Sequence, residues 1–345
     1  MDKRNAVLTA VWFAVGVLLI CCIVLAVGTK KERALLDRKV RLYVYGKGLL
    51  ELDLEEYLVG VVAAEMPASF HAEALKSQAV AARTYTLKRL ERIARTGSPY
   101  PENADITNLP QEGQAWLSED ERKQKWQDDF AQYEKKIRDA VYSTKGEVLV
   151  YDGALIEALY YSTAGPYTED STAVFGAYYP YLKAKPNPYD KHSPRYTDAK
   201  TVSIAELEKA FGVSLDVKNL VLARNLPQGP EVFAAATLLE PWSNPDPTAS
   251  PIKILSRNRS GRVELVQIGS KVVRGVDVRT KLGLRSTNFT FEVSANGNYI
   301  TFQTVGFGHG VGMSQYGADG MAKEGFDYKE ILSFYYPGTQ LVLAR

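Results

Sequence analysis

One uncharged apolar run near the N-terminus constrains the chain most. Residues 6–28 read AVLTAVWFAVGVLLICCIVLAVG, which is 23 residues without a charge, and charged segments flank the run at 2–5 and 29–33. A helix rising about 1.5 Å per residue spans the roughly 30 Å hydrocarbon core of a bilayer at this length. The sequence therefore predicts a transmembrane helix at residues 6–28.

Two processing signals compete with a membrane anchor for this run. A cleaved signal peptide has an apolar region of about 7–15 residues followed by small residues at the cut, and the run shows neither feature. A lipoprotein signal would end at Cys21, but Ile20 is larger than the residue that usually precedes such a cysteine. Basic residues flank the run on both sides almost equally. Because the N-terminal tail is short, we expect a single-pass cell membrane protein with its body outside the cytoplasm.

The cysteines and histidines restrict the chemistry of the body. Cys21 and Cys22 are the two cysteines of the chain, so the residues after the apolar run offer no thiol nucleophile, disulfide or Cys-ligated zinc. The histidines, His71, His192 and His309, are too far apart in sequence for a common metal-binding motif. We therefore expect no metal and no cofactor. The 42 Lys+Arg and 40 Asp+Glu residues give a net charge of +2, which argues against a nucleic-acid partner.

The body mixes strand and helix patterns without the regular strand–helix repeat of a parallel sheet. Alternating apolar residues around two glycines predict a β-hairpin at 39–54, and helical patterns follow at 54–65, 72–92 and 119–141. A loop is expected at 96–117, strands around a turn at 146–161, a short helix at 203–212, repeated short strands at 252–302 and a last helix at 328–335. These patterns predict an α+β fold with mainly antiparallel strands.

Breaks in these patterns suggest four regions. Residues 1–33 would form a cytoplasmic tail and the transmembrane anchor, and residues 34–195 a catalytic core. Residues 196–259 read as an inserted or connecting region, because six prolines fall between residues 227 and 251. Residues 260–345 form a β-rich segment with a glycine-rich motif, which we expect to complete the catalytic cleft.

Glu65 is the carboxylate that the pattern singles out. It falls on the apolar stripe of the helix at 54–65, in the last turn before Pro67. Burial and the negative end of the helix dipole would both raise the pKa of such a carboxyl group. An acid that keeps its proton near neutral pH can protonate a leaving oxygen. The same spacing also fits a Glu at a helix end that points to solvent.

Lys76 and Arg83 are candidate substrate-binding cations. They are seven residues apart in the next predicted helix, which places them on one helix face. Two cations that face a cleft could bind a polar substrate or stabilise developing charge. A solvated helix face explains the same pair.

Ser162, Thr163 and Thr168 lie in the segment STAGPYT, which follows a predicted strand. Hydroxyl groups beside a glycine turn suit hydrogen bonding to a sugar or an amide. An ordinary turn explains them equally well.

A glycine-rich segment, GFGHGVGMSQYG, spans residues 306–317. Glycine at every second position from 306 to 312 would leave one face of a strand bare, so that a ligand or another backbone can approach closely. The alternative is a tightly packed structural strand with a satisfied histidine. The polar candidates for substrate contact in this segment are His309, Ser314, Gln315 and Tyr316.

Several familiar catalytic motifs are missing from the sequence. No GxSxG motif supplies a serine nucleophile. A single candidate acid without an evident second carboxylate argues against an ordinary two-carboxylate glycosidase. The glycine spacing at 306–317 matches neither GxGxxG nor GxxxxGK[ST], so no phosphate loop is expected.

Four blocks of the chain together resemble the stage II sporulation protein D family. They are LEEYLVGVVAAEMPASFHAEALKSQAVAARTYTL at 54–87, YYSTAGPYTED at 160–170, SGRVELVQIG with VRTKLGLRSTNF within 260–289, and GFGHGVGMSQYGADGMAKEGFDYKEILSFYYPGTQL from residue 306. The resemblance runs in order from about residue 39 to 343. The first and last blocks are long and specific.

The resemblance implies a membrane-anchored lytic transglycosylase of endospore-forming bacteria. Such lyases cleave peptidoglycan glycan strands that have lost their stem peptides, and they leave a 1,6-anhydro-N-acetylmuramic acid end. It further implies action in engulfment, in the space between the forespore and mother cell membranes, beside a companion amidase and a membrane scaffold protein. The family's catalytic Glu, in its AAEMP motif, corresponds to Glu65, and its Lys and Arg in the next helix correspond to Lys76 and Arg83.

The implied chemistry needs only one carboxyl group. It protonates the glycosidic oxygen and then, as a carboxylate, helps to remove the proton of the sugar's 6-hydroxyl, which attacks the anomeric carbon in place of water. For a largely neutral glycan, we expect hydroxyls, aromatic rings and bare backbone, rather than a strong basic field, to bind the strand. The related amidase-enhancer modules leave a rival hypothesis, a non-catalytic wall-binding protein that activates an amidase.

The chain departs from the family's pattern at two positions. Pro166 stands where many relatives have the second glycine of Ser-Thr-x-Gly-Gly, and we expect it to restrict the substrate loop. Phe307 stands where they have Trp, which is expected to conserve packing. Some relatives carry a zinc site with Cys and His, but the body of this chain has no Cys, so the metal is not carried over.

Overall fold

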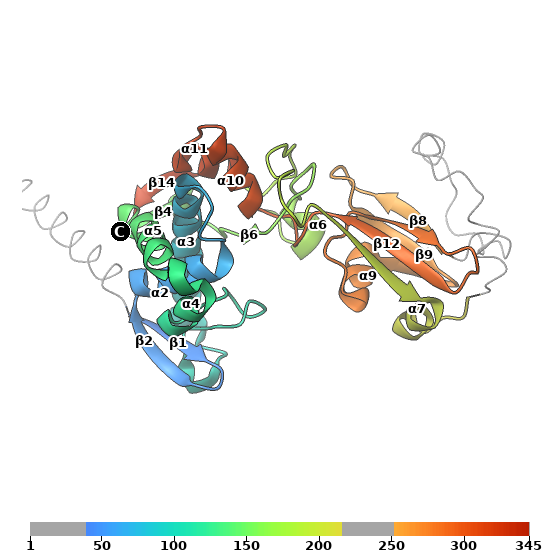
Figure 1. Ribbon diagram of the computed structural model, residues 1–345, viewed down its shortest axis with the longest axis horizontal. Helices are drawn as coiled ribbons and strands as arrows, with labels where there is room; N and C mark the ends of the chain where they lie inside the picture. The colour runs from blue at the N-terminus through green and yellow to red at the C-terminus, as the bar shows by residue number, and fades with distance from the viewer. Residues whose placement is uncertain (1–38, 216–251, 345) are drawn as a thin grey trace, which may run out of the picture. The chain divides into compact units, whose positions relative to one another are not determined.

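The computed structural model describes residues 39–215 and 252–344 (Figure 1). They form two compact units, one of residues 39–158, 326–333 and 338–344, and one of residues 159–215, 252–325 and 334–337. Both units combine helices with mostly antiparallel strands, which confirms the predicted α+β class. None of the helices in these described ranges is long and apolar enough to cross a membrane. The transmembrane helix predicted at 6–28 lies outside the described residues.

The first unit opens with the predicted hairpin. β1 (Lys39–Val44) pairs antiparallel with β2 (Gly48–Asp53), and β3 (Ile106–Thr107) pairs with β1 in parallel. Gly46 adopts a φ of 82° in the turn, a left-handed value that favours glycine. α2 (Leu54–Glu65) follows β2 directly and ends where Met66 becomes extended. That end is the predicted one, because the residue before a proline disfavours helical backbone.

α3 (Ala72–Thr96) is a long helix that packs against α2, α5 and β4. Its cap is His71, whose side chain accepts a hydrogen bond from the Glu73 N–H. The single helix predicted at 119–141 is wrong, because Gln127 takes a left-handed φ of 47° and divides it. The parts are α4 (Glu119–Trp126), a 3₁₀ turn (Gln127–Asp129) and α5 (Phe130–Ser143).

A small antiparallel sheet completes the first unit. β4 (Glu147–Tyr151) turns at Asp152 and Gly153, which both have positive φ, and pairs with β5 (Ala154–Leu155), as the sequence predicts. β14 (Gln340–Leu343) pairs with the other edge of β4. The loop predicted at 96–117 contains only β3 and a 3₁₀ turn (Pro101–Asn103). α11 (Tyr328–Tyr335) confirms the last predicted helix.

In the second unit, a pair of short strands brings together the STAGPYT segment and the glycine-rich segment, which are far apart in the sequence. β6 (Tyr160–Tyr161) leads into the STAGPYT segment and pairs in parallel with β13 (Met313–Ser314), which ends the glycine-rich segment. Two helices that the patterns did not predict follow these strands, α6 (Ser171–Phe175) and α10 (Gln315–Lys323).

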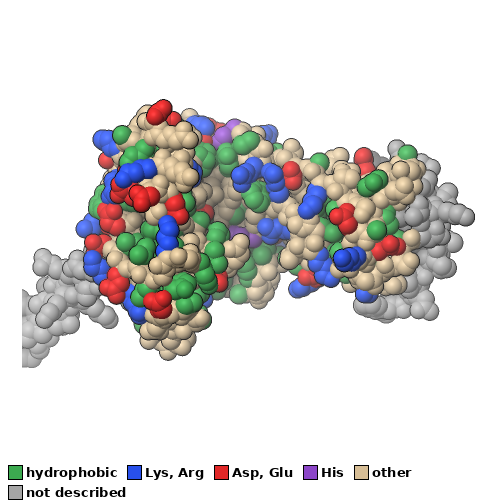
Figure 2. All heavy atoms as spheres, turned by 60° about the horizontal axis from the view of Figure 1, so that its bottom comes forward, with side chains coloured by type: hydrophobic (Ala, Val, Ile, Leu, Met, Phe, Trp, Pro, Cys, Tyr) green, Lys and Arg blue, Asp and Glu red, His purple; other side chains and the backbone are tan. Residues whose placement is uncertain are grey.

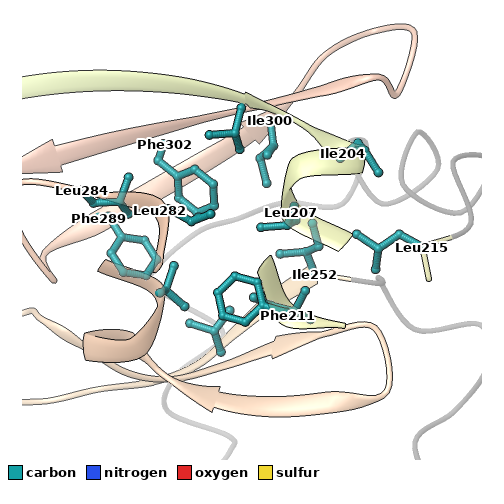
Figure 3. Close-up of a cluster of buried hydrophobic side chains, with 14 of the residues drawn as sticks. Ile204, Leu207, Phe211, Leu215, Ile252, Leu282, Leu284, Phe289, Ile300 and Phe302 are labelled. Carbon is teal, nitrogen blue, oxygen red and sulfur yellow. The ribbon is translucent and has the colours of Figure 1, made fainter. Parts of the chain in front are cut away.

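The rest of the second unit packs two three-stranded antiparallel sheets around one apolar core (Figure 3). One sheet has the order β11-β12-β7 and the other β10-β9-β8. Leu207, Phe211, Phe289 and Phe302 are among the core side chains. The elements are β7 (Thr197–Ser203), α7 (Ile204–Phe211), β8 (Ile252–Arg257), β9 (Val263–Ile268), β10 (Lys271–Arg274), α9 (Gly275–Leu282), β11 (Phe289–Val293) and β12 (Tyr299–Val305).

α7 confirms the predicted short helix, whereas α9 corrects the prediction of strands throughout 252–302. α9 begins at Gly275, where an added Cβ would lie only 2.0 Å from the Val263 carbonyl oxygen. Val278 and Leu282 are one helical turn apart, and both enter the apolar core. The close approach to β9 and the helical spacing therefore override the strand pattern.

Candidate active site

Glu65 is the last residue of α2, and its side chain is half-buried. The backbone N–H of Ala115 donates a hydrogen bond to Glu65 Oε1 at 2.8 Å. Lys125 Nζ donates to the Ala63 carbonyl at 2.8 Å, which places a cation at the negative end of the helix. The Glu65 carboxyl group is therefore held in a defined orientation at the helix terminus.

The loop that carries Ala115 reaches Glu65 by crossing α2 at Gly60. The Leu117 N–H donates to the Gly60 carbonyl at 3.2 Å, and the Trp116 side chain is buried. A Cβ at residue 60 would lie 2.1 Å from Trp116 Nε1 and 2.7 Å from the Leu117 carbonyl oxygen. Gly60 is thus required for this approach. Sequence reasoning missed it, although a glycine inside an apolar helix is a recognised sign of close packing.

Buried polar groups lie beside Glu65 in the same unit. Gln114 Oε1 accepts hydrogen bonds from Thr86 Oγ1 at 2.8 Å and from the Tyr57 hydroxyl at 3.5 Å. Burial raises the pKa of Tyr57 well above its usual range, and the charges of Tyr85 and Glu65 add to this effect. Tyr57 therefore keeps its proton and serves as a hydrogen-bond donor.

Lys76 lies on α3 and is partly exposed, at 28% of its side chain. Its Nζ donates to Glu73 Oε1 at 2.7 Å and lies 5.6 Å from the centroid of the Tyr328 ring. Glu73 Oε2 in turn accepts the Tyr328 N–H at 3.0 Å. Lys76 thus combines a local ion pair with access to solvent.

Arg83 lies two helical turns further along α3, but its side chain is fully buried. Its guanidinium binds both carboxylate oxygens of Glu55, at 3.0 and 2.6 Å, and donates to the carbonyls of Val141 and Glu147. We expected Arg83 to face a cleft, but its side chain is fully buried and paired within the protein. Arg83 links α2, α3, α5 and β4 from within the first unit.

Thr163 and Thr168, in the second unit, are buried against residues 183–193 and Phe307. Thr163 Oγ1 lies 2.8 Å from Ser193 Oγ, and the backbone of Thr163 exchanges two hydrogen bonds with Phe307. Thr168 Oγ1 donates to the Lys183 carbonyl and accepts the Lys185 N–H, both at 3.0 Å. Ser162, by contrast, remains half-buried.

The glycine-rich segment is not the extended strand that its spacing predicts. Gly306, Gly308, Gly310 and Gly312 all have left-handed φ values, from 83° to 119°. A Cβ on Gly312 would lie 2.1 Å from the Leu159 carbonyl oxygen. The predicted close approach of a second backbone is therefore confirmed. The predicted strand with one bare face is wrong, because every second residue has a left-handed backbone, which glycine adopts readily.

His309 has both ring nitrogens occupied. Nδ1 accepts the Val311 N–H at 3.1 Å, so the proton lies on Nε2, which is 3.1 Å from the Tyr160 carbonyl oxygen. Burial, followed by the Arg279 charge, lowers the pKa of His309 to about 4. His309 is therefore neutral at physiological pH and holds the loop together.

Ser314, Gln315 and Tyr316 begin α10. Ser314 caps the helix by accepting the Gly317 N–H at 3.2 Å, and both Ser314 and Gln315 are buried. The Tyr316 N–H donates to the Ser162 carbonyl at 3.1 Å. The Tyr316 side chain is half-buried, with its ring 5.6 Å from that of His192.

Asp190 joins the two motifs of the second unit, and sequence reasoning missed it. Its Oδ2 accepts the Ala164 N–H at 2.6 Å and the Ser314 hydroxyl at 3.0 Å. Burial raises the pKa of Asp190 above its usual value. Asp190 is fully buried, but it lies in a tyrosine-rich loop whose sequence has no periodic pattern that would predict its burial.

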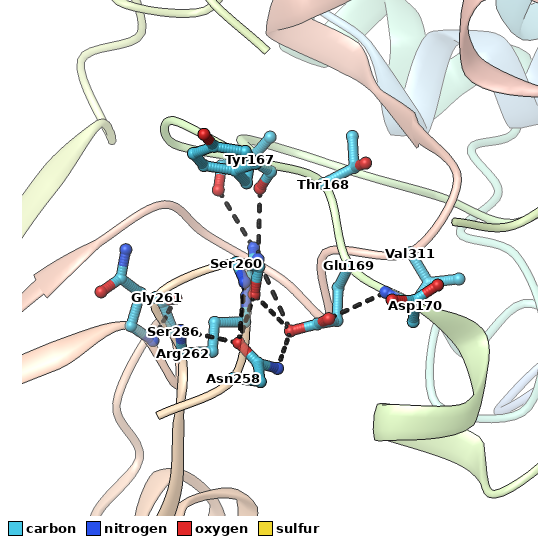
Figure 4. Close-up of polar contacts among 12 residues, drawn as sticks. Tyr167, Thr168, Glu169, Asp170, Asn258, Ser260, Gly261, Arg262, Ser286 and Val311 are labelled. Carbon is cyan, nitrogen blue, oxygen red and sulfur yellow. Dashed lines mark hydrogen bonds and ion pairs between the residues drawn. The ribbon is translucent and has the colours of Figure 1, made fainter. Parts of the chain in front are cut away.

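A second buried carboxylate, Glu169, ties the turn between β8 and β9 to the STAGPYT segment (Figure 4). Its Oε2 accepts hydrogen bonds from Asn258 and Ser260, both at 2.6 Å, and lies 3.8 Å from Arg262 Nη1. Arg262 Nη2 donates to the Ala164 carbonyl at 3.0 Å. The sheet of β8, β9 and β10 is thus coupled to the conformation of the candidate substrate loop.

The predicted site residues fall into two groups. Glu65, Lys76 and Arg83 belong to the first unit, and the other seven belong to the second. Within the described ranges, no set of three or more His, Cys, Asp and Glu side chains is arranged to hold a metal ion. Acidic and basic side chains are interspersed on the face drawn in Figure 2.

Comparisons with known proteins give the family. A family model described as Stage II sporulation protein matches residues 47–151. The chain is 40% identical over 290 residues to stage II sporulation protein D of Bacillus subtilis (strain 168), covering 84% of this chain and 74% of that protein. The protein of the same name from Bacillus amyloliquefaciens is 38% identical with the same coverage. The amidase enhancer of Bacillus subtilis (strain 168) is 32% identical over 306 residues, covering 82% of this chain and 40% of that protein. The chain therefore belongs to the stage II sporulation protein D family.

Proposed function

We propose that this chain is a lytic transglycosylase that cleaves the bond between N-acetylmuramic acid and N-acetylglucosamine in peptide-free glycan strands. The observation that carries the proposal is the half-buried Glu65 carboxyl group, held at the end of α2 by the Ala115 N–H. A carboxyl group in a fixed orientation and shielded in part from water is suited to repeated proton transfer at one bond. Residues 47–151, which match the family model, include both groups.

The proposed reaction is balanced with one carboxyl group. Protonated Glu65 gives its proton to the glycosidic oxygen as the bond from that oxygen to C1 of N-acetylmuramic acid breaks. The Glu65 carboxylate then takes the proton of the 6-hydroxyl of the same sugar while O6 bonds to C1. The products are a 1,6-anhydro end and a free 4-hydroxyl, and Glu65 regains its proton without water being consumed.

The remaining candidates divide by exposure. Lys76, Ser162 and Tyr316 are partly accessible, and we propose that they contact the glycan directly. The buried or satisfied groups are proposed to fix the loops that carry these contacts. They are Arg83, Thr163, Thr168, His309, Ser314 and Gln315.

We further propose that residues 6–28 anchor the chain in the cell membrane, with the body in the space between forespore and mother cell during engulfment. Peptide-free strands require an enzyme that removes stem peptides, so a companion amidase and a membrane scaffold are proposed partners. Membership of a sporulation protein family and the related amidase enhancer support this placement.

A second candidate function is a non-catalytic wall-binding protein that activates an amidase. The similarity to a protein named amidase enhancer over 82% of this chain favours it. This role requires glycan binding but no proton transfer at Glu65.

One experiment separates the two functions. The purified full-length chain is incubated in detergent with peptide-free glycan strands, and separately with intact sacculi and a purified amidase. Release of fragments with anhydro ends by the chain alone supports the transglycosylase. Faster peptide release by the amidase, without any anhydro ends in either reaction, supports the activator and overturns the proposal.

A further inference from the structure

Arg279, in the second turn of α9, is a half-buried cation without a counter-ion in the described part of the chain. No hydrogen-bond acceptor, carboxylate or aromatic ring among residues 39–215 and 252–344 partners its guanidinium group. Three arginines that are more deeply buried are each paired with a carboxylate, Arg83 with Glu55, Arg122 with Glu134 and Arg262 with Glu169. Partial burial removes water from the Arg279 charge without supplying a partner for it, so an anionic ligand would be stabilised at this position.

The chain just beyond α9 contacts the glycine-rich segment, because the Gly308 N–H donates to the Arg285 carbonyl at 3.0 Å. Burial lowers the pKa of the His309 ring of this segment, and the charge of Arg279 reaches that ring and lowers its pKa further. The Phe175 ring lies 5.6 Å from the His309 ring, and 50% of its surface is exposed. An exposed aromatic ring therefore contacts the histidine whose pKa the unpaired Arg279 guanidinium group also lowers.

The local charges favour an anion. Burial and the neighbouring charge of Arg262 lower the pKa of Arg279, which reflects an uncompensated positive charge. His309 is neutral because its Nδ1 accepts the Val311 N–H and burial lowers its pKa, and Glu169 is occupied by Asn258 and Ser260. A guanidinium group binds a carboxylate through two parallel hydrogen bonds, and an aromatic face packs against a sugar ring.

We propose that Arg279 binds a carboxylate carried by a sugar ring that packs on Phe175. This inference rests on the proposed function. In a peptidoglycan strand, that carboxylate is the lactyl group of muramic acid, which becomes free when the stem peptide is removed. A peptide-bearing muramic acid has an amide there, with no charge for Arg279 to bind. The expectation of a largely neutral ligand therefore misses one charge on every second sugar, and Arg279 would select peptide-free strands.

The test measures affinity by titration calorimetry with the full-length chain in detergent, in a Glu65→Gln background that prevents turnover. The two ligands are a tetrasaccharide of alternating N-acetylglucosamine and N-acetylmuramic acid with free lactyl carboxylates, and the same molecule with lactyl carboxamides. We expect the carboxylate ligand to bind about 10- to 100-fold more tightly, as for a charge-assisted hydrogen bond. Arg279→Gln should abolish this preference, and Arg279→Lys should retain part of it.

Arg274→Gln is the matched control, because Arg274 precedes α9, is exposed and pairs with Asp277. It should keep the full preference. Equal affinity of the parent chain for both ligands, or an undiminished preference in Arg279→Gln, overturns the inference. If Arg279→Gln does not fold, the comparison of the two ligands in the parent chain decides alone. A charge preference in a chain that releases no anhydro ends would refute the proposed activity and leave the carboxylate site standing.

Discussion

Replacing Arg83 by Met separates a structural from a substrate-binding role for this residue. Arg83 and Glu55 are fully buried and joined by two hydrogen bonds of 3.0 and 2.6 Å. Removing one partner of a buried ion pair costs about 3–5 kcal/mol, because the remaining charge stays without compensation. Arg138 and Glu56 form a similar two-point pair, but their side chains are 34% and 39% exposed. Arg138 also donates to Glu134, but Glu134 keeps its two hydrogen bonds from Arg122, so Arg138→Met should cost only about 1 kcal/mol.

The assay is urea unfolding of the full-length chain, followed by tryptophan fluorescence, with Trp116 and Trp126 reporting on the first unit. We expect Arg83→Met to lower the free energy of unfolding by about 3 kcal/mol more than Arg138→Met does. The double variant with Glu55→Met should recover part of the loss, because no unpaired charge remains. An Arg83→Met chain as stable as Arg138→Met that no longer binds glycan would refute the structural role and place Arg83 at the substrate.

Three further predictions concern glycine and histidine positions. Gly312→Ala should lower the free energy of unfolding by at least about 2 kcal/mol in thermal unfolding, because the left-handed backbone is strained and the new Cβ overlaps the Leu159 carbonyl. Gly153→Ala is the control, because that glycine is also left-handed but has open space around it, so only the strain should remain. Equal losses in the two variants would contradict the overlap. The pKa of His309 is about 4 in the folded chain and ordinarily 6.5 in an unfolded one. Between these pH values, the unfolded chain therefore binds a proton at His309 that the folded chain does not. Unfolding free energy should therefore fall as pH drops from 6.5 to 4, and His309→Gln should flatten that slope; an unchanged slope would refute the assignment. Gly60→Ala should lower turnover about tenfold by displacing the Ala115 N–H, and full activity would contradict that link.

Local signals predicted the elements whose ends are set by their own residues. The glycines at 46 and 48 gave the first hairpin, and Pro67 gave the end of α2. Ser203 and Gly212 bracket α7 as cap residues do. In each case the determining contacts lie within a few residues along the chain.

Elements set by distant contacts were not predicted. α9 reads like a strand between glycines, but it folds as a helix where Gly275 meets the Val263 carbonyl. The glycine-rich segment has the spacing of a bare strand face, yet its backbone is fixed by contact with residues near Leu159, about 150 positions earlier. Periodicity does not encode such contacts.

The site shows the same division. The stripe on α2 placed Glu65 at the end of a buried helix face, but not the Ala115 N–H that reaches it from a loop. The spacing of Lys76 and Arg83 indicated one helix face correctly, while the buried state of Arg83 depends on Glu55, 28 residues away. Asp190 and Glu169 are buried carboxylates in loops, and only the folded chain shows what they bind.

Proton transfer by Glu65 can be tested by mass spectrometry of the reaction products. Peptide-free glycan strands are digested with the parent chain, with Glu65→Gln and with Glu56→Gln, an exposed carboxylate on the same helix. We expect fragments with 1,6-anhydro ends from the parent and from Glu56→Gln, and none from a folded Glu65→Gln. Anhydro ends released by Glu65→Gln at the parent's rate would show that Glu65 does not transfer the proton.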